Sequence, residues 1–276
     1  MLGKLIKHEW KNTYKFGLLM LGAVALITFL GWLAFQTPMW SLESDRMSWV
    51  DIMGLMTLLM YVVLLLVVHY GVRIYVGVHF YKTMYTDEGY LLHTLPVTKH
   101  QILFSKILVG GLWILIFYLV MYLSYFVLGV SMISAILKDE FTMADLWKEI
   151  LPNMKDLLQG IGDVLGMDVA RWLVTAAISM VVSPFVFVVT LFGAISLGQL
   201  FSRYRVMMAI LSYIGILLVN GLIGSLFKSF IAVGSLSAVG GYLDYSMYIS
   251  SIVSFLMAVA MYFVSWHVTS RRLNMQ

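Results

Sequence analysis

Residues 107–137 read ILVGGLWILIFYLVMYLSYFVLGVSMISAIL, without one Asp, Glu, Lys or Arg. Further uncharged stretches lie at residues 16–35, 52–72, 172–202, 206–227 and 245–270. Because a helix rises about 1.5 Å per residue, about 20 apolar residues span a hydrocarbon layer roughly 30 Å thick, and a helix satisfies its own backbone hydrogen bonds there. The stretches therefore predict an all-α polytopic membrane protein with six transmembrane helices, and residues 1–276 form a single transmembrane domain.

The composition also indicates a membrane protein. Hydrophobic residues make up 61% of the chain and charged residues 12%, whereas soluble domains carry about 25% charged residues. The chain has no cysteine, which excludes disulfides, thiolate metal sites and cysteine catalysis. Basic residues in a membrane protein usually report topology and contact with anionic lipid, so we expect membrane lipid, and no nucleic acid, as a partner.

The distribution of Lys and Arg predicts the orientation of the spans. With the amino terminus inside, the inner segments hold twelve Lys and Arg residues and the outer segments hold six. The positive-inside rule therefore places both termini in the cytoplasm, and six crossings agree with that parity.

Residues 1–15 predict an amphipathic helix that lies on the inner leaflet. The apolar side chains share one side of this helix, and the other side carries Lys4, Lys7, Lys11 and Lys15. We expect these lysines to contact the membrane surface, with contact to a partner as the alternative. Glu9 falls within the apolar arc, so we expect it to pair with a cation, and Arg73 and Arg203 are the candidates for this inner ion pair.

Two outer segments carry further predictions. Residues 134–171 place apolar side chains at helical spacing, which predicts surface helices that either cover the outer end of the bundle or form a lid over a substrate. In this segment Thr142 and Asp145 are expected to cap a helix and Pro152 to break or restart it. The expected end is marked by Gly160, Gly162 and Gly166. Residues 229–243 are uncharged but too short to span, so they predict a re-entrant segment before the sixth span.

Chemistry-bearing motifs are missing from the sequence. It contains no G-x-x-x-x-G-K-[ST], no H-E-x-x-H and no G-x-S-x-G. Ionisable groups are scarce in the spans, whereas proton-coupled carriers and intramembrane hydrolases need them near mid-membrane. We expect His69, His79 and His267 to make interfacial or interhelical hydrogen bonds rather than to bind a metal. The sequence therefore predicts no catalytic residue, no metal site and no cofactor bound by this chain.

The inner loop at residues 81–100 contains a compact apolar group. Its members are Tyr90, Leu91, Leu92 and Leu95. Thr98 and Gln101 match a capping box, so the third span is expected to start just after Pro96 and Val97. This start leaves residues 86–95 as a short element projecting into the cytoplasm. Its apolar group either packs against the amino-terminal helix or contacts a partner.

The same loop carries a recognisable pattern. It reads Asp87-Glu88-Gly89-Tyr90-Leu91, then Thr94-Leu95-Pro96-Val97, and is followed by Ser105-Lys106. This pattern resembles the first cytoplasmic loop of permease subunits of bacterial type-2 ABC exporters. In that family an amino-terminal amphipathic helix precedes six spans, re-entrant helices precede the sixth span, and the loop between spans two and three carries a coupling helix that docks into a separate ATPase. The long outer segment after the third span departs from the family.

The resemblance implies a role, partners and a location. The implied ATPase-coupling residues are Thr86, Asp87, Glu88, Gly89, Tyr90, Leu91, Leu92 and His93. A second permease chain, identical or different, would complete a pathway for a hydrophobic or amphipathic substrate in the bacterial cell membrane. ATP and Mg²⁺ would bind only to the partner ATPase, so this chain is not expected to be an enzyme itself. The alternatives are an accessory membrane subunit and an ATP-independent carrier or channel, the latter disfavoured by the scarcity of polar sites in the spans.

Overall fold

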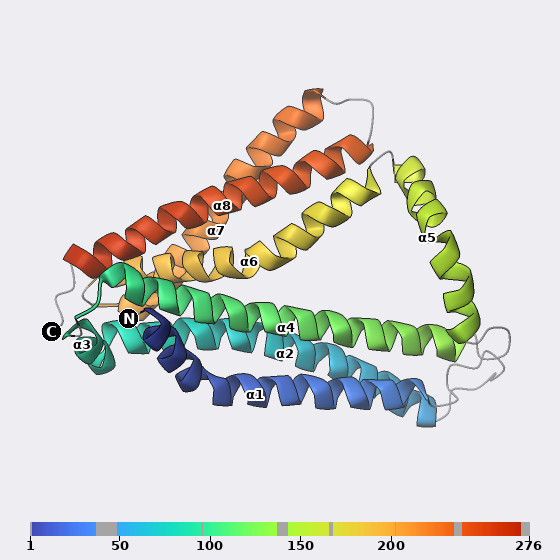
Figure 1. Ribbon diagram of the computed structural model, residues 1–276, viewed down its shortest axis with the longest axis horizontal. Coiled ribbons are helices and arrows are strands. Elements are labelled where there is room, and N and C mark those ends of the chain that lie inside the picture. Colours follow the sequence, from blue (N-terminus) through green and yellow to red (C-terminus); the bar gives the residue numbers. More distant parts are fainter. Residues whose placement is uncertain are drawn as a thin grey trace. The chain divides into compact units, whose positions relative to one another are not determined.

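A computed structural model describes residues 2–36, 49–94, 96–136, 143–165, 168–201, 203–234 and 239–271, and they are helical with short connections. The helices are α1 (Leu2–Phe35), α2 (Trp49–Tyr85), α3 (Asp87–Thr94), α4 (Lys99–Ile136), α5 (Met143–Leu165), α6 (Val169–Gly198), α7 (Arg205–Gly234) and α8 (Val239–Arg271) (Figure 1). Six of them, α1, α2, α4, α6, α7 and α8, are long and apolar enough to cross a membrane. The predicted all-α architecture with six candidate spans is therefore confirmed.

The long helices expose apolar side chains over much of their surface. In α7, for example, Leu218 is 62% exposed and Leu222 is 63% exposed. A helix that is apolar all round needs an apolar environment, which in a soluble protein would be a core. The exposed apolar surface of α7 agrees with contact to lipid hydrocarbon, as in a multi-pass membrane protein.

The helices extend beyond the uncharged stretches. α1 is continuous from Leu2 to Phe35, so residues 2–15 join the first span, and a separate interfacial helix is not confirmed. Most of the predicted re-entrant segment, residues 229–243, belongs to the ends of α7 and α8. The re-entrant path is not confirmed either, and residues 235–238 lie outside the described part of the chain.

The prediction that Pro152 breaks the outer segment is wrong. α5 runs through Pro152, and through Gly160 and Gly162, as one helix. A proline inside a helix frees one backbone carbonyl and crowds the preceding turn. Pro152 and most of the residues that follow it are exposed, so no packed neighbour crowds the proline ring on that side. The predicted cap at Thr142 and the predicted end at Gly166 lie outside the described residues.

The chain divides into two compact units, which we describe separately. The first comprises Met1–Trp10, Tyr75–Leu112 and Asp156–Gln276, and the second comprises Lys11–Ile74 and Trp113–Lys155. In the first unit, α6, α7 and α8 pack against one another.

Glycines let α6 approach both of its neighbours closely. A Cβ atom at Gly193 would lie 2.6 Å from Cβ of Met261 in α8, and a Cβ atom at Gly198 would lie 2.6 Å from Cβ of Ala209 in α7. Pro184 lies midway along α6, and Figure 1 shows this helix changing direction along its length. The change of direction agrees with the kink that a proline inside a helix causes.

In the second unit, α1 packs against α4 through a glycine and a tryptophan. The indole ring of Trp113 occupies the space that a Cβ atom at Gly17 would need, and its Nε1 donates to Oγ1 of Thr13 at 2.9 Å. Further along, Oγ of Ser124 in α4 hydrogen-bonds the hydroxyl of Tyr61 in α2 at 2.8 Å. These contacts fix α1, α2 and α4 against one another within this unit.

We expect Gly17→Ala to lower the melting temperature of the purified chain. The added Cβ atom overlaps three ring atoms of Trp113, and overpacking of this kind costs about 1–3 kcal/mol. Gly22→Ala in the same helix is the matched control, because nothing lies within 4 Å of a Cβ atom there and Ala favours a helix over Gly by about 1 kcal/mol. Equal melting temperatures for the two variants, measured by thermal unfolding in detergent, would contradict this packing.

Candidate functional site

The predicted short element in the inner loop forms as the helix α3. Only Thr86 separates α3 from the end of α2 at Tyr85. At the start of α4, the backbone N–H of Gln101 donates to Oγ1 of Thr98, and the backbone N–H of Thr98 donates to Oε1 of Gln101, each at 3.4 Å. The predicted capping box is therefore confirmed, and α3 stands between two long apolar helices.

Gly89 allows α3 to fold closely against the end of α2. It is buried, and its backbone N–H donates to the carbonyl of Thr86 at 2.8 Å. A Cβ atom at this position would lie 2.5 Å from the backbone carbonyl oxygen of Met84. Because that oxygen belongs to the backbone of α2, it has no side-chain freedom to move aside.

The structure describes some side chains of the predicted coupling segment. Glu88 is exposed and Leu92 is half-buried, while the hydroxyl of Thr86 donates to the carbonyl of Lys82. The side chains of four other predicted residues lie outside the described set, namely Asp87, Tyr90, Leu91 and His93. Contact between this segment and an ATPase stays a prediction.

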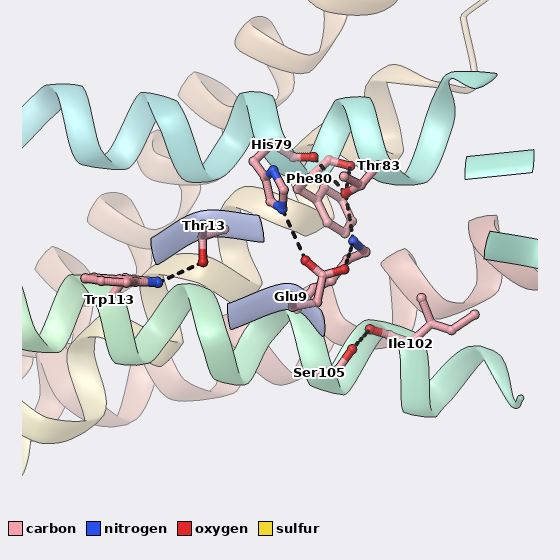
Figure 2. Close-up of polar contacts among 9 residues, drawn as sticks. Glu9, Thr13, His79, Phe80, Thr83, Ile102, Ser105 and Trp113 are labelled. Carbon is pink, nitrogen blue, oxygen red and sulfur yellow. Dashed lines mark hydrogen bonds and ion pairs between the residues drawn. The ribbon is translucent and has the colours of Figure 1, made fainter. Parts of the chain in front are cut away.

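A buried ion cluster joins α1, α2 and α4 within the first unit. Figure 2 shows Glu9 of α1 facing His79 of α2. The Glu9 carboxylate accepts from Nζ of Lys106 in α4 and from Nε2 of His79 at 3.1 Å. Nζ of Lys106 also donates to Oγ1 of Thr83 at 2.7 Å, and the Thr83 hydroxyl donates in turn to the carbonyl of His79 at 2.7 Å. Three helices that are far apart in sequence therefore share one polar network.

Burial makes the pairing within this cluster important. The Lys106 side chain is 2% exposed and the Glu9 side chain is 10% exposed. A charge removed from water is tolerated when it is paired and hydrogen-bonded, as both charges are here. Since a carboxylate only accepts hydrogen bonds, Nε2 of His79 carries the hydrogen in this contact.

The sequence predicted a cation as the partner of Glu9 but did not point to Lys106. The structure pairs Glu9 with Lys106 and with His79. Lys106 stands 97 residues after Glu9 in the chain, and no local spacing indicates a contact over such a separation. The one signal that marked Lys106 in advance was its place in the Ser105-Lys106 pair of the loop pattern.

The two arginines named as candidates lie against aromatic rings. Arg73, in the second unit, donates from Nη2 to the hydroxyl of Tyr118 and stands 5.8 Å from the centre of its ring. The imidazole of His69 stacks on the same tyrosine, with ring centres 5.9 Å apart. Arg203, in the first unit, lies 5.5 Å from the ring centre of Tyr204. Aromatic faces attract cations, which gives both guanidinium groups a favourable contact.

A second buried polar cluster fixes the end of α2 to α6 and α8. The hydroxyl of Tyr85 hydrogen-bonds Oγ of Ser196 at 2.7 Å and Oγ1 of Thr269 at 3.5 Å. Ser196 also hydrogen-bonds Ser265 at 2.8 Å, and both serines are fully buried. Hydrogen bonds in such an apolar setting are costly to break, because each group would be left without a partner.

The beginning of α4 is attached to α8 through an exposed histidine. Nδ1 of His100 hydrogen-bonds the hydroxyl of Tyr262 at 2.9 Å. The imidazole ring also stacks on Trp266, with ring centres 4.9 Å apart. Both flanks of α3, the last turn of α2 and the first turn of α4, are therefore attached to other long helices of the first unit.

The four lysines of the predicted interfacial segment, Lys4, Lys7, Lys11 and Lys15, are exposed. Glu9 and Thr13, one helical turn apart on the same helix, are buried. α1 therefore presents its cations away from the packed side, as contact with a membrane surface requires. That contact itself stays a prediction.

Within the described ranges, no group of three or more His, Asp or Glu side chains is arranged to hold a metal ion. Comparison of the chain with family models, with curated proteins and with solved structures finds no match. Among the described residues, α3 and the contacts that hold its flanks are therefore the candidate functional element.

Proposed function

We propose that this chain is a transmembrane subunit of an ATP-driven ABC exporter in a bacterial cell membrane, with α3 receiving force from a separate ATPase subunit. The observation that carries the proposal is the attachment of both flanks of α3. Tyr85 ties the preceding turn to α6 and α8, and His100 ties the following turn to α8. Lys106 adds a link to α1. A displacement of α3 is therefore passed to several spans, as mechanical coupling requires.

In this mechanism the chemistry and the movement are divided between subunits. ATP and Mg²⁺ bind to two ATPase subunits, whose closure draws together the α3 helices of two permease chains. The spans of each chain then tilt, and a cavity between the chains opens outward. Most of each span consists of uncharged residues, so a cavity between the spans would have an apolar wall. The cargo is therefore a hydrophobic or amphipathic molecule.

The proposal places both termini and α3 in the cytoplasm. The excess of Lys and Arg in the inner segments supports this orientation. Reporter fusions within residues 81–100 test it directly. An external location of that reporter would separate α3 from any cytosolic ATPase and would overturn the proposal.

Charge placed on α3 is expected to uncouple the ATPase. Tyr90→Asp combined with Leu91→Asp adds two carboxylates to the apolar group of the loop, and desolvating them at an interface is unfavourable. We expect co-purification of an ATPase from native membranes to be lost, while the chain remains inserted. The measurement is ATP hydrolysis by the purified complex, and the chain alone is expected to hydrolyse no ATP above background.

A matched control places the same charges on α5. Leu157 and Ile161 are about half-exposed there, so replacing both with Asp perturbs an aqueous helix without touching α3. Unchanged ATPase recovery with the α3 variant would contradict the coupling role. Transport that persists after this chain is removed from the complex would instead indicate an accessory subunit. Transport by the chain alone in ATP-free proteoliposomes would indicate a carrier or channel.

A further inference from the structure

An open groove lies where α6 ends beside the last turns of α8. Its volume is about 490 Å³, within the range of roughly 300–1,000 Å³ that is typical of small-molecule sites. Leu197 and Leu200 line one side, and Phe263 and Val264 line the other. The wall is therefore largely apolar, with His267 as a polar side chain at its surface.

The groove lies at the same end of the first unit as α3. Leu197 directly follows Ser196, and Val264 directly precedes Ser265. Those two serines belong to the buried cluster that contains Tyr85, one residue before the connection to α3. In the predicted orientation this end faces the inner leaflet, where anionic lipids attract basic residues.

Two arginines follow Leu200 of the groove closely in the chain, and neither has an acidic partner among the described residues. Arg203 and Arg205 follow Leu200 by three and five residues in the connection to α7. A chain extends at most about 3.6 Å per residue, so the backbone of Arg203 lies within about 11 Å of Leu200. Residues 169–243 contain no Asp or Glu, and neither arginine forms an ion pair in the part of the chain that the structure describes.

Arg205 has a hydrogen-bond donor without an acceptor among the described residues. Its Nε atom is buried and has no hydrogen-bond acceptor among the described residues. A buried donor without an acceptor costs about 1–3 kcal/mol, and the cost is larger for a charged group. An anionic oxygen supplied by a ligand would remove this cost, and it would pair with the exposed guanidinium of Arg203 as well.

We propose that this groove binds one anionic phospholipid of the inner leaflet. An acyl chain lies along Leu197, Leu200 and Phe263, and the phosphate is held by Arg203 and Arg205. A neutral headgroup would give the arginines no net counter-charge. A second copy of this chain is a poorer occupant, because a symmetric contact would bring two basic connections together. Lipid binding here requires the inner placement of this end but not the coupling of α3 to an ATPase.

Brominated phospholipids test the site, because Trp266 also lines the groove and bromine in an acyl chain quenches nearby tryptophan. The full chain is reconstituted in phosphatidylcholine, and brominated phosphatidylglycerol is titrated in. Subtracting the fluorescence of the Trp266→Phe variant from that of the unchanged protein gives the fluorescence of Trp266 alone. We expect saturable quenching by the anionic lipid, and about 30-fold weaker binding in Arg203→Gln/Arg205→Gln, since each basic residue near an anionic headgroup contributes about fivefold.

Lys148→Gln/Lys155→Gln removes the same charge from α5 and is expected to bind as the unchanged protein does. Val264→Phe fills the groove without changing charge and is expected to weaken binding, which keeps the test available if the arginine variant does not fold. Equal quenching by brominated phosphatidylcholine, or equal losses in the two charge variants, would overturn the proposal. Reversal of quenching by inorganic phosphate would assign the site to a free anion and would overturn it too.

Discussion

Glu9→Gln is expected to destabilise the purified chain by about 3–5 kcal/mol, because it leaves the Lys106 ammonium buried without its counter-charge. The Lys106 side chain is only 2% exposed, so water cannot take the place of the carboxylate. Thr83 remains as an acceptor for Nζ, but a hydroxyl carries no net charge. His79 loses its anionic acceptor in the same step.

Removing both charges is expected to cost much less than the two single changes together. Lys106→Met leaves Glu9 as a buried anion, whereas Glu9→Gln/Lys106→Met leaves no buried charge in the pair. Residues in direct contact show interaction energies of about 0.5–3 kcal/mol in double-mutant cycles. Thermal unfolding of the four proteins in one detergent measures this interaction energy.

The pair of Asp168 and Arg171 provides the control for this cycle. Nε of Arg171 lies 3.8 Å from the Asp168 carboxylate, and their side chains are 68% and 53% exposed. An exposed pair contributes about 0–1 kcal/mol, so Arg171→Gln should leave the melting temperature nearly unchanged. Additive losses in the Glu9 and Lys106 cycle would show that the two residues do not act as a pair.

The spans were predictable from the sequence because their signal is local. Each uncharged stretch is apolar enough by itself to favour a hydrocarbon environment, and α7 is apolar on every side. The cap of α4 was predictable for the same reason, since Thr98 and Gln101 are three residues apart and meet through one helical turn.

The remaining features depend on tertiary packing or on solvent. The partner of Glu9 is set by the way α1 packs against α2 and α4. The spacing of Glu9 and Lys106 in the sequence carries no information about that packing. Pro152 is a strong local breaker, yet α5 continues through it where its neighbours are exposed. Local rules therefore predicted which segments are helical better than they predicted which side chains meet.

Tertiary packing also explains why the buried polar clusters could not be predicted from the sequence. Ser196, Ser265 and Tyr85 are ordinary residues of apolar helices until α2, α6 and α8 bring them together. Their hydrogen bonds concentrate at the end of the first unit that carries α3. These three residues thus hold the end of α2 that precedes α3, so a small change in how α3 packs on α2 should be measurable.

Gly89→Ala is expected to displace α3 from the end of α2. The new Cβ atom would lie 2.5 Å from the carbonyl oxygen of Met84, and the backbone of α2 is held in place through Tyr85. Overpacking destabilises the contact between the two helices by about 1–3 kcal/mol. Local opening of the loop therefore becomes about 5- to 150-fold more frequent. Trypsin cleavage after the exposed Lys82, measured on the chain alone, reports this opening.

Gly22→Ala is the matched control, because a Cβ atom there meets nothing within 4 Å. It should leave cleavage after Lys82 unchanged. If Gly89→Ala does the same, the close fit of α3 against Met84 is wrong. If cleavage increases while recovery of the ATPase stays constant, the fit is right but α3 is not the coupling element. If cleavage increases and ATPase recovery falls together, the close packing at Gly89 is needed for coupling to the ATPase, since the substitution adds one methyl group and no charge.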